Sequence, residues 1–239
     1  GNGSIYVTGY TQGTLEGSNA GSDDAYIRKL APDGSVEWTN QFGSNQQDRA
    51  EAVAISPDGH IYVAGSTTGD LDGANAGGED GFLTKFQDNG TQVWTVQFGD
   101  GTNQSLRGVN VASDGTIYVT GWDDGNGLLR KFDDQGTTIW SRQIASTTTV
   151  NTPSDRGYDV VVSPDSAFVY VAGTTQGVFD GNSGGWNNGD WDGFLAKYQS
   201  DGTINWVKQT QSSPTAVDEL HSVAIGLDGN IFVAGYTMG

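Results

Sequence analysis

Apolar and polar residues alternate along this chain over short segments of five to eight residues. The segments are rich in Val, Ile, Tyr, Phe and Trp, and they are bounded by Gly, Asp or Asn, which is the pattern of β-strands. No segment keeps a helical spacing of apolar residues over ten positions. The sequence therefore predicts an all-β protein without helices.

One strand-like string recurs along the sequence. Its five copies are "IYVTGY" at 5, "IYVAGS" at 61, "IYVTGW" at 117, "VYVAGT" at 169 and "IFVAGY" at 231. The copies are 56, 56, 52 and 62 residues apart, and each interval contains strand-like segments in the same order. Four consecutive antiparallel strands in each unit of ~50 residues, repeated around an axis, predict a β-propeller.

The strings "IYVAGST", "DGFLTKF" and "AEAVAISPDG" resemble the bacterial seven-bladed β-propeller repeat family. The resemblance covers nearly the whole chain in four successive units. It implies a secreted or surface-exposed bacterial protein, at an extracellular or cell-surface location, and one module of a larger adhesin-like chain. It implies no reaction.

The repeat also sets the expected domain organisation. Residues 1–239 form one β-propeller region of four-stranded antiparallel blades. Seven blades of ~56 residues would need about 390 residues, so this chain is expected to be an incomplete arc of a larger propeller rather than a complete small ring. An arc exposes sheet edges, which predicts self-association through open blade edges. The expected boundaries are a partial blade at 1–47, blades at 48–103, 104–153 and 154–217, and a partial blade at 218–239.

Composition narrows the classes of partner. The formal net charge of −18 argues against a nucleic-acid partner, because that binding needs Lys and Arg to neutralise phosphates. No apolar run approaches the ~18 residues of a membrane span, so membrane insertion is not expected. The absence of Cys from the sequence excludes disulfides, thiolate metal sites and cysteine nucleophiles.

Three of the loops that follow the recurring string share an order of acid, Gly, Asn and acid. Carboxylates, Asn side chains and Gly-freed carbonyls are hard oxygen ligands that suit Ca²⁺. The alternative is a solvated loop whose last Asp begins the next strand. The candidate calcium ligands are Asp70, Asp72, Asn75, Glu79 and Asp80, with Glu16, Asn19, Asp23, Asp24, Asp180, Asp190 and Asp192 in the matching loops.

Two further sets of residues recur once per repeat. A lysine set is interpreted as structural, with each ammonium meeting an acid, rather than as an anion-binding ring. Asp48, Asp155 and Asp218 are either partners of these lysines or acceptors for local backbone. A tryptophan set is expected to pack between blades rather than to stack on sugars. The two sets are Lys29, Lys85, Lys131 and Lys197, and Trp38, Trp94, Trp140 and Trp206, each of these Trp residues followed three positions later by Gln.

Trp122, Trp186 and Trp191 do not recur, and they lie in or beside the variable loops. Exposed aromatic residues on loops are good ligand contacts, so these three are the candidate ligand-binding residues.

Catalytic constellations are missing from the sequence. The two histidines, His60 and His221, lie in different segments, and no nucleophile elbow, zinc helix or phosphate loop is present. The sequence favours a non-catalytic module that binds a protein or a glycan, with calcium as a candidate stabilising ion. The alternative is a propeller hydrolase or lyase acting on polysaccharide, with Asp190 and Asp192 beside Trp186 and Trp191.

Overall fold

The structure is a computed structural model that describes residues 3–147, 154–179, 190–210 and 216–238. Every regular element in these residues is a β-strand, so the expected all-β fold is confirmed. The chain divides into two compact units, residues 1–109 and residues 110–239. No helix in the described part of the chain has the length and apolar character needed to cross a membrane.

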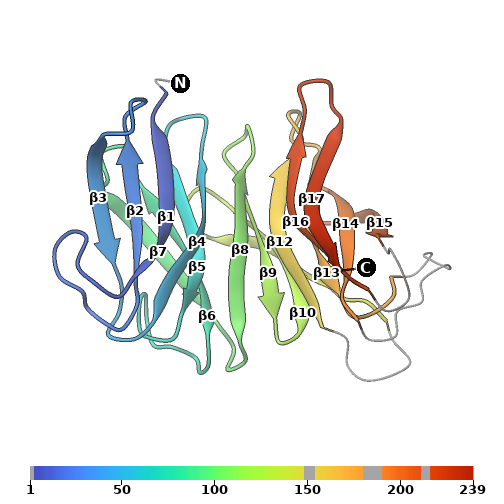
Figure 1. Ribbon diagram of the computed structural model, residues 1–239, viewed down its shortest axis with the longest axis horizontal. Coiled ribbons are helices and arrows are strands. Elements are labelled where there is room, and N and C mark those ends of the chain that lie inside the picture. The colour runs from blue at the N-terminus through green and yellow to red at the C-terminus, as the bar shows by residue number, and fades with distance from the viewer. Residues whose placement is uncertain (1–2, 148–153, 180–189, 211–215, 239) are drawn as a thin grey trace. The chain divides into compact units, whose positions relative to one another are not determined.

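The first unit contains a three-stranded and a four-stranded sheet, each antiparallel with its strands in chain order (Figure 1). The recurring string is the second of the four strands, and the Trp-bearing segment is the edge strand. The three-stranded sheet consists of β1 (Ile5–Thr11), β2 (Asp24–Leu30) and β3 (Val36–Phe42). The four-stranded sheet consists of β4 (Asp48–Ile55), β5 (Ile61–Thr67), β6 (Asp80–Phe86) and β7 (Gln92–Phe98).

The second unit repeats this pattern. Strand β8 contains the division between the units and is the first strand of a sheet in the order β8-β9-β10-β11. A four-stranded antiparallel sheet and a two-stranded sheet follow. The strands are β8 (Gln104–Val111), β9 (Ile117–Asp123), β10 (Asn126–Phe132), β11 (Thr138–Ile144), β12 (Asp155–Val162), β13 (Phe168–Thr175), β14 (Asp192–Gln199), β15 (Ile204–Thr210), β16 (Val217–Ile225) and β17 (Ile231–Met238). Four-stranded antiparallel sheets of the propeller-blade type are therefore confirmed, whereas the blade boundaries and the incomplete arc stay predictions.

Asx-Gly turns join the strands as the sequence predicts. Gly59, Gly115 and Gly229 adopt φ of 87°, 83° and 80°, the left-handed region that glycine enters without strain. The residue before the glycine closes the turn with its side chain: Asp114 Oδ1 accepts a hydrogen bond from the Thr116 amide at 2.9 Å. The same contact recurs at Asp33, Asn89, Asp201 and Asp228.

The glycine of the recurring string is required by the neighbouring strand. The pairing of β4 with β5 shifts register between Ala50 and Ala52, which marks a β-bulge. The bulge brings the β4 backbone so close to β5 that a Cβ on Gly65 would lie 1.9 Å from the Arg49 carbonyl oxygen. The same close approach occurs at Gly173, where Arg156 O would lie at 2.0 Å. Close backbone approach therefore explains why this glycine recurs.

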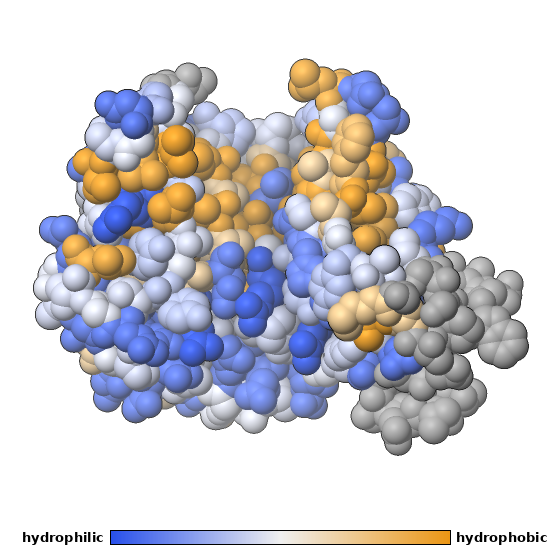
Figure 2. Space-filling view, in the orientation of Figure 1, coloured by the Kyte–Doolittle hydropathy of each residue, from blue (hydrophilic) through white to orange (hydrophobic). Residues whose placement is uncertain are grey.

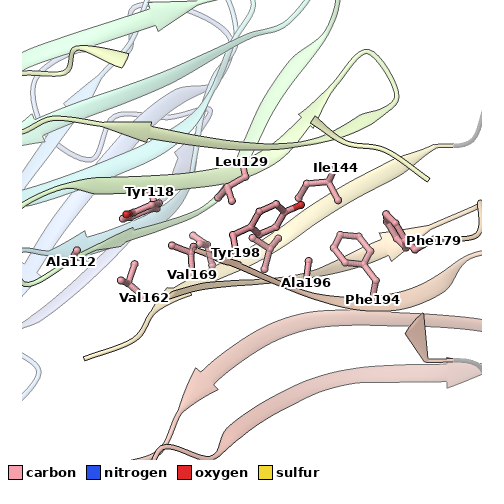
Figure 3. Close-up of a cluster of buried hydrophobic side chains, with 12 residues drawn as sticks. Ala112, Tyr118, Leu129, Ile144, Val162, Val169, Phe179, Phe194, Ala196 and Tyr198 are labelled. Atoms are coloured by element: carbon pink, nitrogen blue, oxygen red, sulfur yellow. The ribbon is translucent and has the colours of Figure 1, made fainter. Parts of the chain in front are cut away.

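Buried side chains lie between neighbouring sheets within each unit. In the first unit, Phe82 and Phe86 pack with Ala25, Ile27 and Val63. In the second unit, Figure 3 shows the corresponding cluster, in which Leu129 and Tyr118 lie on one side and Val169, Tyr198 and Phe194 on the other. These aromatic and aliphatic side chains come from the third and second strands, whose alternation the sequence pattern predicts.

Strand β17 has the composition of a buried strand but is exposed. The equivalent strand β5 is buried at every position, whereas Phe232, Tyr236 and Met238 of β17 are 59%, 46% and 61% exposed. Hydrophobic residues gather over β16 and β17 in Figure 2. The reason is that the sheet holding β17 has two strands in the described residues. Self-association through such an edge stays a prediction.

The close approach at Gly65 predicts a large effect of one added methyl group. We expect Gly65→Ala to lower the free energy of unfolding by about 2 kcal/mol or more, because the new Cβ must displace backbone rather than a side chain. Urea unfolding would measure the change. The control is Gly13→Ala, whose Cβ would find its nearest neighbour, Thr11 Oγ1, at 3.8 Å. Equal stability of the two variants would contradict this explanation of the repeat glycine.

Candidate functional site

A glutamine and an aspartate hold the acidic loop between β5 and β6. Gln97 Oε1 accepts hydrogen bonds from the amides of Leu71 at 2.8 Å and Asp72 at 3.0 Å. Its Nε2 donates to the Gly69 carbonyl at 3.0 Å and to Asp80 Oδ2 at 2.9 Å. Both ends of the Gln97 amide are therefore used by the loop, and we call this arrangement the Gln–Asp clamp.

The clamp recurs in two other sheets. Gln41 accepts from the Leu15 amide at 2.8 Å and donates to Asp24 Oδ2 at 3.0 Å. Gln209 donates to Asp192 Oδ2 at 2.9 Å and to the Gly177 carbonyl at 3.1 Å. In these three sheets, the glutamine that lies three positions after the repeated Trp positions the loop of its own sheet.

The candidate calcium ligands accept or donate hydrogen bonds within the protein. Asp80 Oδ2 also accepts from the Ala76 amide at 3.0 Å, while Asp80 Oδ1 has no hydrogen-bond partner in the described residues. Asp70 Oδ1 accepts from the Asn75 amide at 2.8 Å, and Glu79 accepts from the Ser66 hydroxyl. The remaining members behave similarly: Asn75, Glu16, Asn19, Asp23 and Asp24 all take part in loop hydrogen bonds or ion pairs.

Calcium binding at these loops stays a prediction. Among the described residues, no three side chains of the His, Cys, Asp or Glu type are gathered closely enough to hold a metal ion. Asp72 joins the clamp through its amide rather than its carboxylate. Asp180 lies outside the described residues. The hydrogen bonds give the alternative, an acidic loop held by protein donors, a definite structural basis.

The ionisation of Asp192 is perturbed by its surroundings. Burial raises the pKa of its carboxyl to about 6, and the nearby charges of Asp218 and Asp190 act in the same direction. The hydrogen bond from Gln209 opposes this rise by stabilising the charged form. Asp192 therefore changes charge closer to neutral pH than an ordinary carboxylate does.

The repeated lysines are structural, as expected, but their partners differ from one lysine to the next. Lys29 Nζ lies 2.9 and 2.8 Å from the two Asp88 carboxylate oxygens and 3.3 Å from Glu37, which holds its pKa above the ordinary value. Lys131 Nζ instead donates to the Ser200 carbonyl at 3.2 Å. Each lysine also lies near the tyrosine of the recurring string, as Lys29 does at 5.8 Å from the Tyr6 ring.

Asp48 and Asp155 do not pair with these lysines. Asp48 Oδ2 accepts from the Ser44 amide at 2.6 Å, and the Thr67 hydroxyl donates to the other oxygen. Asp155 Oδ2 accepts from the Ser146 amide at 2.9 Å. Burial raises the pKa of both carboxyls, and these donors oppose the rise. Both carboxylates therefore accept hydrogen bonds from backbone amides, which confirms the second of the two expected roles.

Packing is confirmed for the repeated tryptophans. Trp38 and Trp140 are partly buried against the hydrophobic clusters of their units. The Trp38 indole donates to the Asp88 carbonyl at 3.0 Å, and a Cβ on Gly90 would lie 3.1 Å from its ring. Trp140 makes the same contacts with the Ser200 carbonyl and Gly202. Each of these indoles therefore packs on the hairpin turn of the next sheet.

Two of the three unrepeated tryptophans converge on one arginine. The Arg156 guanidinium carbon lies 5.2 Å from the centre of the Trp122 ring and 4.9 Å from that of Trp191. Trp122 is in β9, Arg156 is the second residue of β12, and Trp191 immediately precedes β14. All three side chains are half-buried. We call this arrangement the Trp–Arg–Trp stack; Trp186 lies outside the described residues.

Arg156 was missed in the sequence-based selection of ligand contacts. The available signal was a pair of "DR" dipeptides at 48–49 and 155–156, each at the start of a first strand. In a chain with 11 basic residues, an arginine repeated at a loop end is informative. The approach of residues 122 and 191 to Arg156 depends on how the strands pack, which sequence spacing alone does not give.

The two histidines form no catalytic constellation with each other. His60 contacts Asp58 in a hairpin turn of the first unit at 2.8 Å. In the second unit, His221 contacts Glu219 at 2.8 Å and stacks on Tyr158 with ring centres 4.5 Å apart. Neither has a described serine or threonine nucleophile among these partners.

Comparison with known proteins bears on the repeat. Residues 37–72 match the family SBBP, described as "Beta-propeller repeat". This segment of the chain is similar to a β-propeller repeat. The matched residues run from β3 through β4 and β5 into the acidic loop, so they include the repeated Trp, the bulged first strand and the recurring string. The predicted family resemblance is therefore confirmed.

One curated relative is similar to part of this chain, and two solved structures are similar to most of it. The regulatory protein FlaEY of Caulobacter vibrioides is 29% identical over 101 residues, which is 39% of this chain and 11% of that protein. The Pan2 WD40 domain of Neurospora crassa has a TM-score of 0.48 at 14% identity, covering 90% of this chain and 58% of that one. The periplasmic gluconolactonase PpgL of Pseudomonas aeruginosa has a TM-score of 0.45 at 14% identity, covering 96% and 76%. The propeller-repeat chain thus spans about a tenth of the curated relative, and no activity is carried over.

The Gln–Asp clamp makes a prediction for the acidic loop. We expect Gln97→Leu to speed amide hydrogen exchange at Leu71 and Asp72 at least about tenfold, because both amides lose their acceptor. Site-resolved exchange by NMR would measure it. Gln92→Leu is the control, since the described contact of Gln92 is with Thr95. Unchanged exchange at residues 71 and 72 would show that the glutamine does not hold the loop.

Proposed function

We propose that the propeller-repeat chain is a non-catalytic module that binds a glycan or a protein through its loops, at an extracellular or cell-surface location. The observation that carries the proposal is the Trp–Arg–Trp stack. Trp and Arg are the residue types that contribute most to binding interfaces. Trp122 and Trp191 do not recur, so the sheets do not need them for packing at every repeat.

The contrast with the repeated tryptophans supports this assignment. Trp38 and Trp140 use their indole N–H groups and ring faces on a neighbouring turn, which is a packing role. The rings of Trp122 and Trp191 instead flank a cationic side chain at the loop ends of β9 and β14. Loops held by a rigid sheet are the usual place for ligand contacts. Here the Gln209–Asp192 clamp fixes the residue next to Trp191.

One observation favours a second candidate, a hydrolase or lyase acting on polysaccharide. A carboxyl with a pKa of about 6, as at Asp192, is suited to act as a general acid near neutral pH. Asp190 lies close enough to raise that pKa, so two carboxyls lie beside Trp191. Against this candidate, Asp80 and Asp24 occupy the Asp192 position in other sheets and serve their clamps.

Glycan and protein arrays, each run in calcium and in EDTA, test the proposal. We expect binding to at least one ligand, with Trp122→Ala and Trp191→Ala each weakening it about tenfold or more. The matched control is Ile204→Ala, an exposed apolar residue on β15 of the same unit, which should bind normally. A reducing-sugar assay on any polysaccharide that binds should show no turnover. Turnover that Asp192→Asn abolishes would replace the binding proposal by the enzymatic one.

A further inference from the structure

An arginine in the first unit, Arg49, occupies the same position in the repeat as Arg156. Arg49 is the second residue of β4, as Arg156 is of β12. Its guanidinium lies 4.7 Å from the centre of the Tyr10 ring. Its Nε and Nη2 donate to Asp23 Oδ2 at 2.8 and 2.6 Å, which lowers the pKa of that buried carboxyl. At this position, Arg49 therefore binds a carboxylate while its guanidinium lies over an aromatic ring.

The repeat aligns each neighbour of Arg49 with a neighbour of Arg156. Tyr10 corresponds to Trp122, because both end the recurring string. Asp23 corresponds to Gly125: the Asp23 carbonyl accepts from the Asp48 amide at 2.7 Å, and the Gly125 carbonyl accepts from the Asp155 amide at 2.7 Å. Arg156 thus keeps the aromatic face but has a glycine where Arg49 has its carboxylate.

In the described part of the chain, the Arg156 guanidinium is in contact with two indole rings and with no acid. Trp191 supplies the second ring, at the position that Glu79 occupies in the sheet that contains Arg49. A chain of net charge −18 offers many acids, so an arginine with no acid partner among the described residues is a distinctive feature. Stacking between rings holds the guanidinium in place while its N–H groups remain available for a bidentate acceptor.

A comparison within the same unit separates this arrangement from ordinary packing. Arg142 also lies over a tryptophan, 5.3 Å from the Trp140 ring centre. Its N–H groups, however, donate to the carbonyls of Gly202 at 3.2 Å, Ser141 at 2.9 Å and Asp201 at 3.4 Å. Where this fold uses an Arg–Trp stack for packing, the backbone satisfies the guanidinium. At Arg156, no backbone carbonyl among the described residues accepts a hydrogen bond from the guanidinium.

We propose that Arg156 binds the carboxylate of an acidic sugar, with Trp122 and Trp191 contacting the sugar rings. This assignment rests on the proposed binding function and gives it a ligand class. A guanidinium can donate two N–H groups to one carboxylate, and Arg49 does so to the Oδ2 atom of Asp23. Flat aromatic faces suit the apolar face of a pyranose ring. The net charge of −18 repels polyanions and acidic peptides, so the ligand is a glycan with an isolated uronic acid.

The test uses pairs of disaccharides that differ in one group. Each pair is a disaccharide ending in glucuronic or galacturonic acid and its carboxyl-reduced neutral counterpart, titrated into the whole chain by calorimetry. We expect at least one acid member to bind about tenfold or more tightly than its neutral counterpart. Arg156→Gln should abolish that preference, and Arg156→Lys should lose most of it because ammonium lacks the planar fork.

Arg142→Gln is the matched control and should keep the preference, since the Arg142 N–H groups already bind carbonyls. Melting curves of all variants would confirm that they fold. Equal binding of acid and neutral members, or a preference that survives Arg156→Gln, would overturn the carboxylate assignment while leaving glycan binding intact. Binding of acidic peptides alone would overturn the sugar assignment in favour of a protein partner. No binding to any sugar or protein would reject the proposed function as well.

Discussion

One backbone hydrogen bond recurs between successive sheets, and it ties the start of each first strand to the loop of the sheet before it. The amide at the start of a first strand donates to the carbonyl just before the third strand of the preceding sheet: Asp48 to Asp23, Gln104 to Glu79, Asp155 to Gly125 and Asp218 to Trp191, at 2.6–2.7 Å. Because both partners are backbone groups, the side chain at the carbonyl position is free to vary. That position accordingly holds Asp, Glu, Gly or Trp, and it forms one side of each arginine site.

Residues that recur serve the sheets, and the proposed ligand contacts are residues that do not recur. The repeated Gly65, Gln97 and Trp38 each have a packing or clamping role that the structure accounts for. Arg49 and Arg156 are intermediate, because the arginine is kept while its carboxylate is present in one sheet and replaced in the other.

Much of the fold could be predicted from the sequence because strand alternation and turn chemistry are local. The string "IYVAGS", the Asp-Gly turns and the Trp-bearing edge strand all gave the correct elements. The candidate site was predicted only in part. The acidic residues were interpreted as cation ligands, but Asp80 and Asp24 accept from Gln side chains 17 residues away, a contact that requires knowledge of strand register. Arg156 was missed because its two indoles come from segments 69 residues apart in the sequence.

We propose that the unrepeated Trp122 and Trp191 contact a ligand and that the four repeated tryptophans do not. The most direct test of this claim is an NMR titration that follows the assigned indole N–H signals of the chain's seven Trp residues while the best-binding sugar is added. The account predicts that the signals of Trp122 and Trp191 shift in a saturable manner while those of Trp38, Trp94, Trp140 and Trp206 stay in place. Saturable shifts confined to the repeated four would contradict it.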